Sequence, residues 1–499
     1  MGAPKPYDGA GIEIVADGAA KQGVANSAAP AVYEWLLVGA GITGVYGIGA
    51  VPPQQRSGVL VIEQQERVGG LWAQLPRWQT VQNDPIDFCT EGFTTRKKVW
   101  TADDVCHLLE MKIKVQGLAP YIKMGHKLEG YVWSEEDQHW VCQVTRLADG
   151  ARLQILTKRL LLGTGKHARP LIPEVKTDGS VTVLHSSQIA DLGILKGKKV
   201  AVVGAGASAI DLCMHSLQHG AEGKVEWILR EARHFSGISF NTLWPMILVQ
   251  LLYWQWLAYA ALNLIVTAVV YGRHLVGGTL SWMPGRWYDV RYEQLVPGRG
   301  YLVSNKRRVS RRAGTEVSRI EGGALHLTNG DVIEGVDYLL MGTGYAPPER
   351  PAGFERPQNF AGFLPTGPHR GRLWLMGEDL LDTTAATPFV AYMLAIVYRA
   401  LADDPDVLSK LADAPRPAGG ADALGRPRLL NAMDVFVAVA PLARGLFPWY
   451  VWRVRMLGLY LYYRLVHKTV VFFPNTVIKT GMNLDEMERD TELVAVVAE

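Results

Sequence analysis

Residues 34–70 read EWLLVGAGITGVYGIGAVPPQQRSGVLVIEQQERVGG, and this stretch decides the fold. A short apolar run at residues 35–38, bounded by glycine, is typical of a buried parallel strand. The turn GAGITG follows at once and opens a helix, and a second apolar run, residues 59–62, ends in Glu63. We therefore predict a strand, a tight turn, a helix and a second parallel strand, as in a doubly wound α/β sheet.

The glycines of this turn fit the requirements of a bound pyrophosphate. Gly39 permits the tight turn, Gly41 lets backbone N–H groups approach the anion, and Gly44 lets the helix pack close to the strand. Glu63 follows the glycines by about 20 residues, where a carboxylate hydrogen-bonds a ribose 2′-OH. Because a carboxylate disfavours a 2′-phosphate, the turn predicts FAD or NAD rather than NADP; a purely structural turn is the alternative. The candidate contacts are Gly39, Gly41, Ile42, Thr43, Gly44 and Glu63.

Length and composition bound the classes of protein that are possible. The 499 residues are too many for one simple core and predict two or three domains. Hydrophobic residues make up 48% and charged residues 20%, which excludes a disordered chain, and a net charge of +3 gives no indication of a nucleic-acid partner. The cysteines are scattered without a C-x-x-C motif, which fits a reducing compartment and excludes the redox dithiol of a disulfide reductase.

A second strand, turn and helix are predicted at residues 199–209, KVAVVGAGASA. Two such units in one chain are far more specific than one. The next strand, residues 225–229, ends in Arg230 instead of an acid. Arginine can pair bidentately with a 2′-phosphate, so this unit predicts NADPH rather than NADH, with a solvated surface arginine as the alternative. The candidate contacts are Gly204, Gly206, Ser208, Ala209 and Arg230.

The first turn, Glu63 and the stretch VGGLW at residues 68–72 together resemble the FAD half of the flavin-containing (class B) monooxygenases. In that family the G-G-x-W loop lies along the flavin, and an Asn shortly downstream lies near the reactive flavin edge. The matching positions are Gly70, Leu71, Trp72 and Asn83. The G-x-G-x-S-A form of the second turn is common in the NADPH half of these enzymes. Residues 77–79, RWQ, differ from the usual Baeyer–Villiger pattern and favour the N-/S-oxygenating branch.

Further motifs extend the resemblance over residues 35–401. Residues 159–165, RLLLGTG, resemble the family's A-T-G turn, and residues 341–345, MGTGY, resemble its F-A-T-G-Y motif. His185 and Ser186 match the core of the fingerprint at the crossing between the domains, but its flanking positions are degraded. The apolar run at residues 373–376 resembles the last FAD-domain strand. The resemblance adds as cofactor contacts Thr164, Gly165, Thr343, Gly344, Tyr345 and Gly377.

The predicted fold is α/β, with two Rossmann-type, three-layer dinucleotide-binding domains, the FAD domain being split around the NADPH domain. The expected divisions are a mobile tail at 1–30, the FAD domain at 31–180 and 325–403, the NADPH domain at 181–324 with an apolar helical insertion at 236–272, and a helical apolar C-terminal extension at 404–499. Within them we expect a helix at 101–115, a β-meander that includes 131–133 and 140–145, and a hairpin at 325–331. The basic run at 306–312 is interpreted as a solvated strand edge, with a phosphate or lipid contact as the alternative.

Two apolar, aromatic-rich stretches lie outside the nucleotide folds. Residues 236–272 contain no charged residue, which suits interfacial helices or a cavity lining, with a buried core helix and a true span as alternatives. Residues 435–484 carry six Lys or Arg and no acid, which suits a helix in the headgroup region of an anionic membrane or a cap over the substrate cavity. We predict contact with a membrane surface, on the cytosolic face of an internal membrane, or otherwise a cytoplasmic location.

The resemblance implies an FAD- and NADPH-dependent monooxygenase, with a role in secondary metabolism. In that family NADPH reduces the flavin, O₂ adds to give a C4a-hydroperoxide, and the distal oxygen passes to a nucleophilic N, S or activated carbon. Asn83 would then be the catalytic residue that positions the peroxide or the nicotinamide. The alternatives are Baeyer–Villiger oxygen insertion, a membrane-associated NAD(P)H dehydrogenase, and a flavin-binding protein without turnover. The apolar stretches predict a small, lipophilic substrate; neither a metal nor nucleic acid is expected as a partner.

Overall fold

A parallel sheet forms around the first glycine-rich stretch. It contains β5 (Ile122–Lys123), β3 (Val59–Ile62), β2 (Val32–Val38) and β8 (Ala151–Leu162) in that order, with β22 (Leu373–Leu375) parallel to β8. Leu37 is in register with Val61 on one side and Leu161 on the other. Strand β3 and the ends of β2 and β8 beside it, residues 36–38 and 160–162, are buried, which explains the unbroken apolar sequence of these parts. The predicted βαβ arrangement is therefore confirmed.

The long strand β8 joins this sheet to an antiparallel meander. Its first half pairs with β7 (His139–Arg146), which pairs with β6 (His126–Ser134), while its last residues pair with β2 and β22. Apolar side chains from both parts pack in one core: Leu36, Val38, Leu60, Ile62, Leu128, Tyr131, Trp140, Cys142, Val144, Leu153, Ile155, Leu160, Leu162 and Leu373. The meander predicted from the alternating sequence is confirmed.

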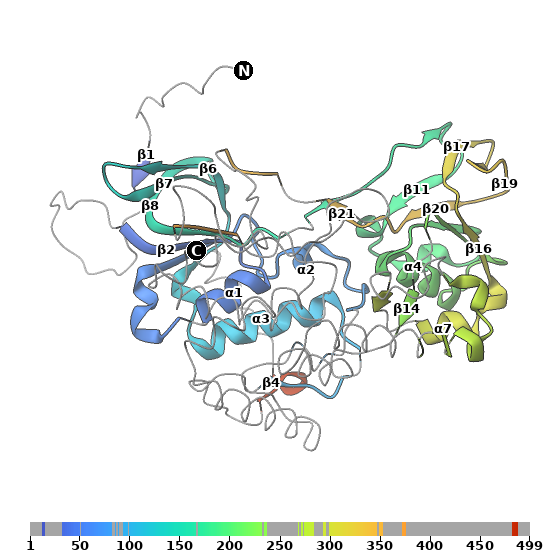
Figure 1. Ribbon diagram of the computed structural model, residues 1–499, viewed down its shortest axis with the longest axis horizontal. Coiled ribbons are helices and arrows are strands. Elements are labelled where there is room, and N and C mark those ends of the chain that lie inside the picture. Colours follow the sequence, from blue (N-terminus) through green and yellow to red (C-terminus); the bar gives the residue numbers. More distant parts are fainter. Residues whose placement is uncertain are drawn as a thin grey trace.

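Helices α1 (Ile42–Gly49) and α3 (Ala102–Gln116) pack together beneath this sheet (Figure 1). Thr101 and Asp104 form a capping box at the start of α3, and Gly117 ends the helix in the left-handed conformation. Helix α3 therefore begins and ends within two residues of the range predicted from the sequence. The shorter elements of this unit are α2 (Leu71–Gln74), η1 (Pro53–Gly58) and η3 (Ala119–Tyr121). We call this sheet and its helices the first unit.

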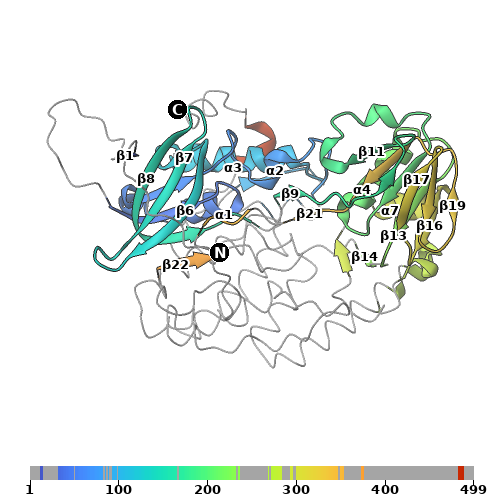
Figure 2. The ribbon, with the colours of Figure 1, turned by 90° about the horizontal axis from the view of Figure 1, so that it is seen from above.

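A second unit lies beside the first (Figure 2). Its parallel sheet has the order β11 (Thr182–His185), β20 (Tyr338–Met341), β12 (Val200–Val203), β13 (Val225–Leu229) and β16 (Val309–Ala313). Helices α4 (Ala207–Gln218) and α7 (Arg299–Ser304) contribute to the core on one face. On the other face lies a small sheet of β10 (Lys176–Thr177), β17 (Val317–Glu321), β18 (Ala324–Leu327) and β19 (Val332–Ile333). The unit thus has three layers, and the hairpin predicted at 325–331 is formed by β18 and β19.

The observed pairing corrects the predicted boundary at residue 324. Strand β20 lies between β11 and β12 in the second sheet, and β18 and β19 cover that sheet, so residues 325–341 belong to the second unit. The chain leaves and re-enters the first unit through β9 (Arg169–Pro170) and β21 (Tyr345–Ala346), which pair antiparallel. The apolar run of β20 fits either sheet equally well, which is why its sequence did not decide between them.

The structure describes residues 12–14, 32–49, 51–81, 85, 88, 93–97, 99–165, 168–231, 234–236, 268, 271–272, 274–283, 293–295, 299–346, 349–352, 372–375 and 482–487. Within the predicted mobile tail, β1 (Ile12–Ile14) pairs with Arg152–Gln154 of β8, which corrects that expectation for these three residues.

The remaining short elements are β4 (Phe93–Thr94), β14 (His234–Ser236), β15 (Glu293–Leu295), β23 (Met482–Asn483), η4 (Ser186–Gln188), η5 (Leu192–Leu195), η6 (Leu280–Trp282), η8 (Lys306–Arg308) and η12 (Leu484–Glu486).

Most of the two apolar stretches, 236–272 and 435–484, falls outside the described residues. Within the described part of the chain, no helix has both the length and the apolar character needed to cross a bilayer.

The basic run at 306–312 makes several contacts within the second unit. Arg312 on the edge strand β16 pairs with Glu226 and Asp331, and Arg311 lies over the Trp227 ring, where burial lowers its pKa to about 10. The strand-edge position is confirmed, but this part of the run is not simply solvated.

Candidate functional site

The first glycine-rich turn is held closely between β2, β3 and α1. The Gly39 N–H donates to the Ile62 carbonyl at 2.7 Å, and Gly39 adopts a φ of 106°, which favours glycine. A Cβ atom on Gly44 would lie 1.8 Å from the Gly39 carbonyl oxygen. The first turn of α1 therefore packs directly against the backbone of Gly39, which leaves the helix N-terminus facing the mouth of the turn.

Glu63 lies directly beside this turn. Its carboxylate accepts hydrogen bonds from the Ala40 N–H at 2.7 Å and the Gln65 N–H at 2.9 Å, and the residue is 5% exposed. Burial raises the pKa of the Glu63 carboxyl, and the backbone hydrogen bonds act in the opposite direction. The end of β3 thus delivers a carboxylate to the glycine turn, as the fit of a nucleotide ribose requires.

The G-G-L-W stretch faces the turn from the other side. The Gly69 N–H donates to the Ala40 carbonyl at 3.1 Å, and a Cβ atom on Gly41 would lie 3.4 Å from the Gly70 Cα. Leu71 and Trp72 follow in α2, and the Trp72 ring meets the Phe88 ring edge-on with the centroids 6.3 Å apart. The three described atoms nearest to a Cβ on Gly41 are all backbone atoms of Gly69 and Gly70, which is the kind of surface that a flavin pyrophosphate needs.

Gly163 and Thr164, at the end of β8, support the same turn and lead directly to Gly165. A Cβ atom on Gly39 would lie 2.6 Å from the Gly163 carbonyl oxygen, and one on Gly163 would lie 2.8 Å from the Thr43 Cγ2. Gly165 has a φ of 71°. The structure thus brings the predicted FAD residues of the first turn, of the G-G-L-W stretch and of the β8 exit into one place, with Glu63 beside them.

The second turn is more open than the first. Gly204 has a φ of 128°, and its N–H donates to the Ile228 carbonyl at 3.0 Å. Gly206 precedes the first residue of α4, and a Cβ atom built on it would meet no described atom within 4 Å. Ser208 and Ala209 lie buried in the first turn of α4. Among the described residues, nothing covers the backbone at residue 206, as expected where a phosphate approaches a helix N-terminus.

A repeat that the sequence analysis missed supports both turns in the same way. Gly163-Thr164-Gly165 follows β8, and Gly342-Thr343-Gly344 follows β20. A Cβ atom on Gly204 would lie 2.3 Å from the Gly342 carbonyl oxygen, which matches the contact of Gly39 with Gly163 in the first unit. The two sequences LLLGTG and LLMGTG carried this signal, because each is an apolar strand that runs into the same glycine turn.

The structure therefore places Thr343, Gly344 and Tyr345 behind the second turn and at the crossing between the units, and not in the first turn. The Thr343 hydroxyl donates to the Leu171 carbonyl. His185 lies with its Nε2 at 3.0 Å from the Gly344 carbonyl oxygen, and the Tyr345 ring meets the His185 ring edge-on at 5.2 Å. Burial lowers the pKa of His185 and raises that of the Tyr345 hydroxyl. These contacts connect His185, in the segment that enters the second unit, to residues 344 and 345, where the chain returns to the first unit.

Arg230 follows β13, at the same end of the sheet as the second turn. Its side chain is 77% exposed, and its Nε lies 3.6 Å from the Glu316 Oε1, whose side chain is 54% exposed. An exposed ion pair of this kind stabilises the fold by only about 0 to 1 kcal/mol, so the guanidinium can exchange partners at low cost. Asn83 and Gly377 lie outside the described residues.

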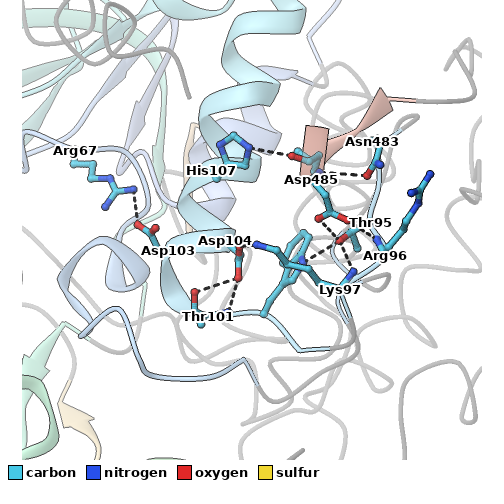
Figure 3. A network of polar contacts seen from close by, with 12 residues as sticks. Arg67, Thr95, Arg96, Lys97, Thr101, Asp103, Asp104, His107, Asn483 and Asp485 are labelled. Atoms are coloured by element: carbon cyan, nitrogen blue, oxygen red, sulfur yellow. Dashed lines mark hydrogen bonds and ion pairs between the residues drawn. The ribbon is translucent and has the colours of Figure 1, made fainter. Parts of the chain in front are cut away.

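The C-terminal segment docks next to the chain that follows Asn83 (Figure 3). Strand β23 pairs with β4, the Thr95 hydroxyl donates to the Asp485 Oδ1 at 2.8 Å, and the Arg96 N–H donates to the Asp485 Oδ2 at 2.7 Å. The Lys97 ammonium lies 2.6 Å from Asp104, which caps α3. The last described residues of the chain thus anchor the segment 93–97 on the first unit, a contact across 390 residues.

Comparison with known proteins agrees with this geometry. The family model for L-lysine 6-monooxygenase/L-ornithine 5-monooxygenase matches residues 114–238. The FAD-containing monooxygenase EthA of Mycolicibacterium smegmatis is 24% identical over 216 residues, 41% of this chain and 43% of that protein. The indole-3-pyruvate monooxygenase YUCCA4 of rice (Oryza sativa subsp. japonica) is 24% identical over 218 residues, 40% of this chain and 48% of that protein. The chain thus matches less than half the length of these curated relatives.

Solved structures share the fold. The cyclohexanone monooxygenase from Rhodococcus sp. Phi1 bound to NADP⁺ superposes with a TM-score of 0.59 at 13% identity, covering 84% of this chain and 98% of that one. OTEMO in complex with FAD and NADP gives a TM-score of 0.53 at 14% identity, covering 74% and 86%. The two glycine turns and this fold define a flavoprotein with two dinucleotide-binding units. Over part of its length the chain is thus similar in sequence to FAD-containing monooxygenases, and it shares the fold of solved class B monooxygenases, as its motifs predicted.

Proposed function

We propose that the protein is an FAD-dependent monooxygenase that uses NADPH and O₂ to oxygenate a small lipophilic substrate. The observation that supports this most directly is the pair of glycine turns, one followed by the buried acid Glu63 and the other by the exposed Arg230. A carboxylate suits a free ribose hydroxyl, and a guanidinium suits a 2′-phosphate. Each cofactor is therefore expected at a different unit of the molecule.

In this proposal the backbone of Gly39, Gly41 and Gly70 holds the FAD pyrophosphate, and Glu63 accepts a hydrogen bond from the ribose. The closeness of Gly41 to Gly70 means that a side chain at either position would fill the cradle. Gly206, with free space in front of its Cα, admits the NADPH pyrophosphate, and Arg230 turns from Glu316 to the 2′-phosphate. The bound flavin supplies the hydride acceptor and the activation of O₂.

Asn83 retains the role expected from the resemblance, hydrogen bonding near the reacting edge of the flavin. Hydrogen bonds hold residues 79 and 81 before it and residues 95 and 96 after it on the first unit. Replacement of Asn83 by Ala or Asp should keep FAD binding and reduction by NADPH while diverting O₂ to hydrogen peroxide. Unchanged coupling of NADPH to product would remove Asn83 from the site.

The reaction type follows from which substrates are oxygenated. The relatives named above act by their names on lysine or ornithine, indole-3-pyruvate and cyclohexanone, so similarity alone does not choose among them. The motif at residues 77–79 favours N- or S-oxygenation. Purified protein should be tested with an amine, a sulfide and a ketone of matched apolar size. A lactone or ester product from the ketone, with no oxide from the other two, would establish the Baeyer–Villiger reaction instead.

The decisive experiment for the class of reaction measures stoichiometry. A monooxygenase consumes one O₂ and one NADPH for each oxygenated product. A membrane-associated NAD(P)H dehydrogenase would instead oxidise NADPH without O₂ when a soluble quinone is supplied. A protein that binds flavin without turnover would do neither. Product formation that keeps pace with O₂ consumption supports the proposal, and anaerobic turnover with a quinone contradicts it.

Membrane contact is a further part of the proposal and rests on the composition of 236–272 and 435–484 alone. Deleting everything from Ala432 onward, the simplest test, would also remove β23 and Asp485, which anchor β4. An internal deletion of residues 435–478 joined by a flexible linker keeps that anchor. The proposal expects the intact protein to float with anionic liposomes and the deletion to release much of it. An intact protein that ignores such liposomes would assign both stretches to a closed substrate cavity.

A further inference from the structure

The short segment Trp78-Gln79-Thr80 is held by both units at once. On the first unit, the Gln79 carbonyl accepts from the Ala102 N–H at 3.0 Å, and Thr80 forms an antiparallel bridge with Thr101 at the start of α3. The segment follows α2 and directly precedes the chain that leads to Asn83. Its backbone therefore belongs to the first unit, whereas its side chains point to the second.

Trp78 inserts into the second unit. Its indole Nε1 donates to the Ile189 carbonyl at 2.6 Å, and its ring meets the His215 ring of α4 edge-on with the centroids 5.2 Å apart. The ring also packs against the apolar core on the α4 face of the second sheet. An indole that is half-buried in the core of another unit contributes apolar contact and one directional hydrogen bond.

Gln79 and Thr80 add two side-chain hydrogen bonds to the same helix. The Gln79 Nε2 donates to the Ser208 Oγ at 3.0 Å, and the Thr80 Oγ1 donates to the Asp211 Oδ1 at 3.0 Å. The three contacted residues of α4 are Ser208, Asp211 and His215. They are spaced three and four residues apart, so they lie on one face of the helix. Three consecutive residues of the first unit thus contact one face of the helix that begins at the second glycine turn.

The bonds are buried, which makes them sensitive to the loss of either partner. Gln79 is 6% exposed, Ser208 is 9% exposed and Asp211 is 1% exposed. A buried polar group left without its partner costs far more than the bond itself contributes. Burial also raises the pKa of the Asp211 carboxyl to about 7, against the effect of the Thr80 hydrogen bonds. The arrangement therefore favours one position of α4 relative to the segment.

We propose that Thr80 and Asp211 are positioning residues, whose hydrogen bond fixes the second glycine turn relative to the segment that leads to Asn83. The inference rests on the proposed function, since it joins the groups assigned there to NADPH and to the reacting edge of the flavin. Ser208 belongs to the same contact, because it is both a predicted NADPH contact and the acceptor for Gln79. The nucleotide held by α4 and the chain before Asn83 then move as one body.

The test compares Thr80→Val, which keeps the shape and removes the donor, with Thr80→Ser, which keeps the donor. Thr145→Val, in the meander strand β7, is the matched control. At saturating NADPH, Thr80→Val should reduce the flavin about tenfold more slowly, as the loss of a buried hydrogen bond of about 1.4 kcal/mol predicts, and should release more hydrogen peroxide per NADPH. FAD content and the dissociation constant for NADPH should stay within about twofold of wild type. Thr80→Ser and Thr145→Val should match wild type throughout.

A merely structural role predicts a different result. Thr80→Val would then lower the melting temperature but leave the rate of flavin reduction per bound FAD unchanged, and that outcome overturns the proposal. If Thr80→Val yields no folded protein, Gln79→Met, which removes the bond to Ser208 with little change in shape, should slow reduction in the same direction. Normal reduction and coupling in Gln79→Met would overturn the proposal in that case.

Hydrogen exchange separates this inference from the proposed function. In the purified protein, Thr80→Val should raise the exchange of backbone amides in α4 and at residues 99–104, whether or not the enzyme turns over. Unchanged exchange at both places would overturn the contact as a positioning device. The two proposals can fail separately. If Thr80→Val raises the exchange but the wild-type protein consumes no O₂ with NADPH, the contact between the units is upheld and the proposed monooxygenase activity is refuted.

Discussion

The two glycine turns follow the same plan, but the first is closed and the second is open. In the first unit, residue 44 leaves no space for a Cβ atom, and Glu63 lies buried against the turn. In the second unit, residue 209 is an alanine, Gly206 borders free space, and Arg230 is exposed beyond the strand end. The same motif thus forms one site suited to a cofactor that stays bound and one suited to a cofactor that exchanges.

The two turns differ in the third glycine position of the motif and in the charged group that follows the next strand. A glycine at position 44 lets α1 reach the Gly39 carbonyl, whereas the matching position of the second unit, Ala209, carries a methyl group. A carboxylate enclosed by backbone N–H groups is preorganised for a ribose, while an arginine on the surface is free to follow its ligand. The buried acid of the first site and the exposed arginine of the second therefore distinguish the two sites more clearly than the motif letters do.

The largest effect that tests this comparison is expected for Gly44→Ala. A methyl group at this position would lie 1.8 Å from a backbone oxygen, so α1 must move away from the turn. We expect a cost on the order of 4 kcal/mol or more and a protein that is insoluble or purifies without flavin. Absorbance at the flavin bands measures the result. Gly206→Ala, whose methyl group meets no described atom, is the control and should keep full flavin; equal loss in both variants would contradict the comparison.

The βαβ units could be predicted from the sequence because their signals are local. Apolar runs of four residues, glycines at fixed spacing and the acid or arginine at the next strand end all lie within about 30 residues of one another. The boundary near residue 324 could not be predicted, because the choice of sheet for β20 depends on its pairing with the distant strand β11, in which Thr182 is in register with Tyr338. The contacts of Gln79 and Thr80 with α4 span 129 and 131 residues, and a sequence shows no pattern for single hydrogen bonds of that kind.

The second prediction concerns the pH dependence of stability. It depends on Asp211, which accepts a hydrogen bond from Thr80 between the two units. Because burial raises the pKa of its carboxyl from 3.8 to about 7, the folded protein holds a proton that the unfolded chain releases. The corresponding stabilisation is complete below about pH 4 and is lost as the pH rises through about 7, up to about 4 kcal/mol in all. His215, one turn further along α4, has its pKa lowered to about 4 by burial and so stays neutral over the upper part of this range.

Asp211→Asn isolates this group, since the amide has the shape of the protonated acid and does not titrate. Thermal unfolding followed at pH 5, 6, 7 and 8 should show a smaller loss of stability with rising pH than in wild type. Asp337→Asn on the surface of the second unit is the control: hydrogen bonds from the Lys199 N–H and the Lys198 ammonium lower the pKa of its carboxyl below 3.8, so its contribution is lost only at lower pH and its curve from pH 5 to 8 should run parallel to that of wild type. Parallel pH curves for wild type and Asp211→Asn would show that Asp211 does not titrate in this range.

The third prediction tests the open site through Arg230. Its loss should remove one charge-assisted interaction of about 1.5 to 3 kcal/mol with a 2′-phosphate, so Arg230→Ala should raise the KM for NADPH roughly 10- to 150-fold and leave that for NADH unchanged. Glu316→Gln should act in the opposite direction, because it releases the arginine from its 3.6 Å partner. Steady-state kinetics with both nucleotides measure this. Arg319→Ala, exposed in the same unit, is the control, and equal effects on NADPH and NADH would refute the assignment.

The smallest expected effect concerns the described C-terminal segment, residues 482–487, which pairs with β4 of the first unit. Asp485 accepts one hydrogen bond through each carboxylate oxygen, from Thr95 and from the Arg96 N–H. Asp485→Asn keeps one acceptor and should cost about 1 kcal/mol, seen as a lower temperature of flavin release by fluorescence. Glu486→Gln removes only the ion pair with Arg96, in which the side chains are 66% and 85% exposed, and should change nothing measurable. A larger shift for Glu486→Gln than for Asp485→Asn would mean that charge, and not the pairing of β23 with β4, holds the C-terminal segment in place.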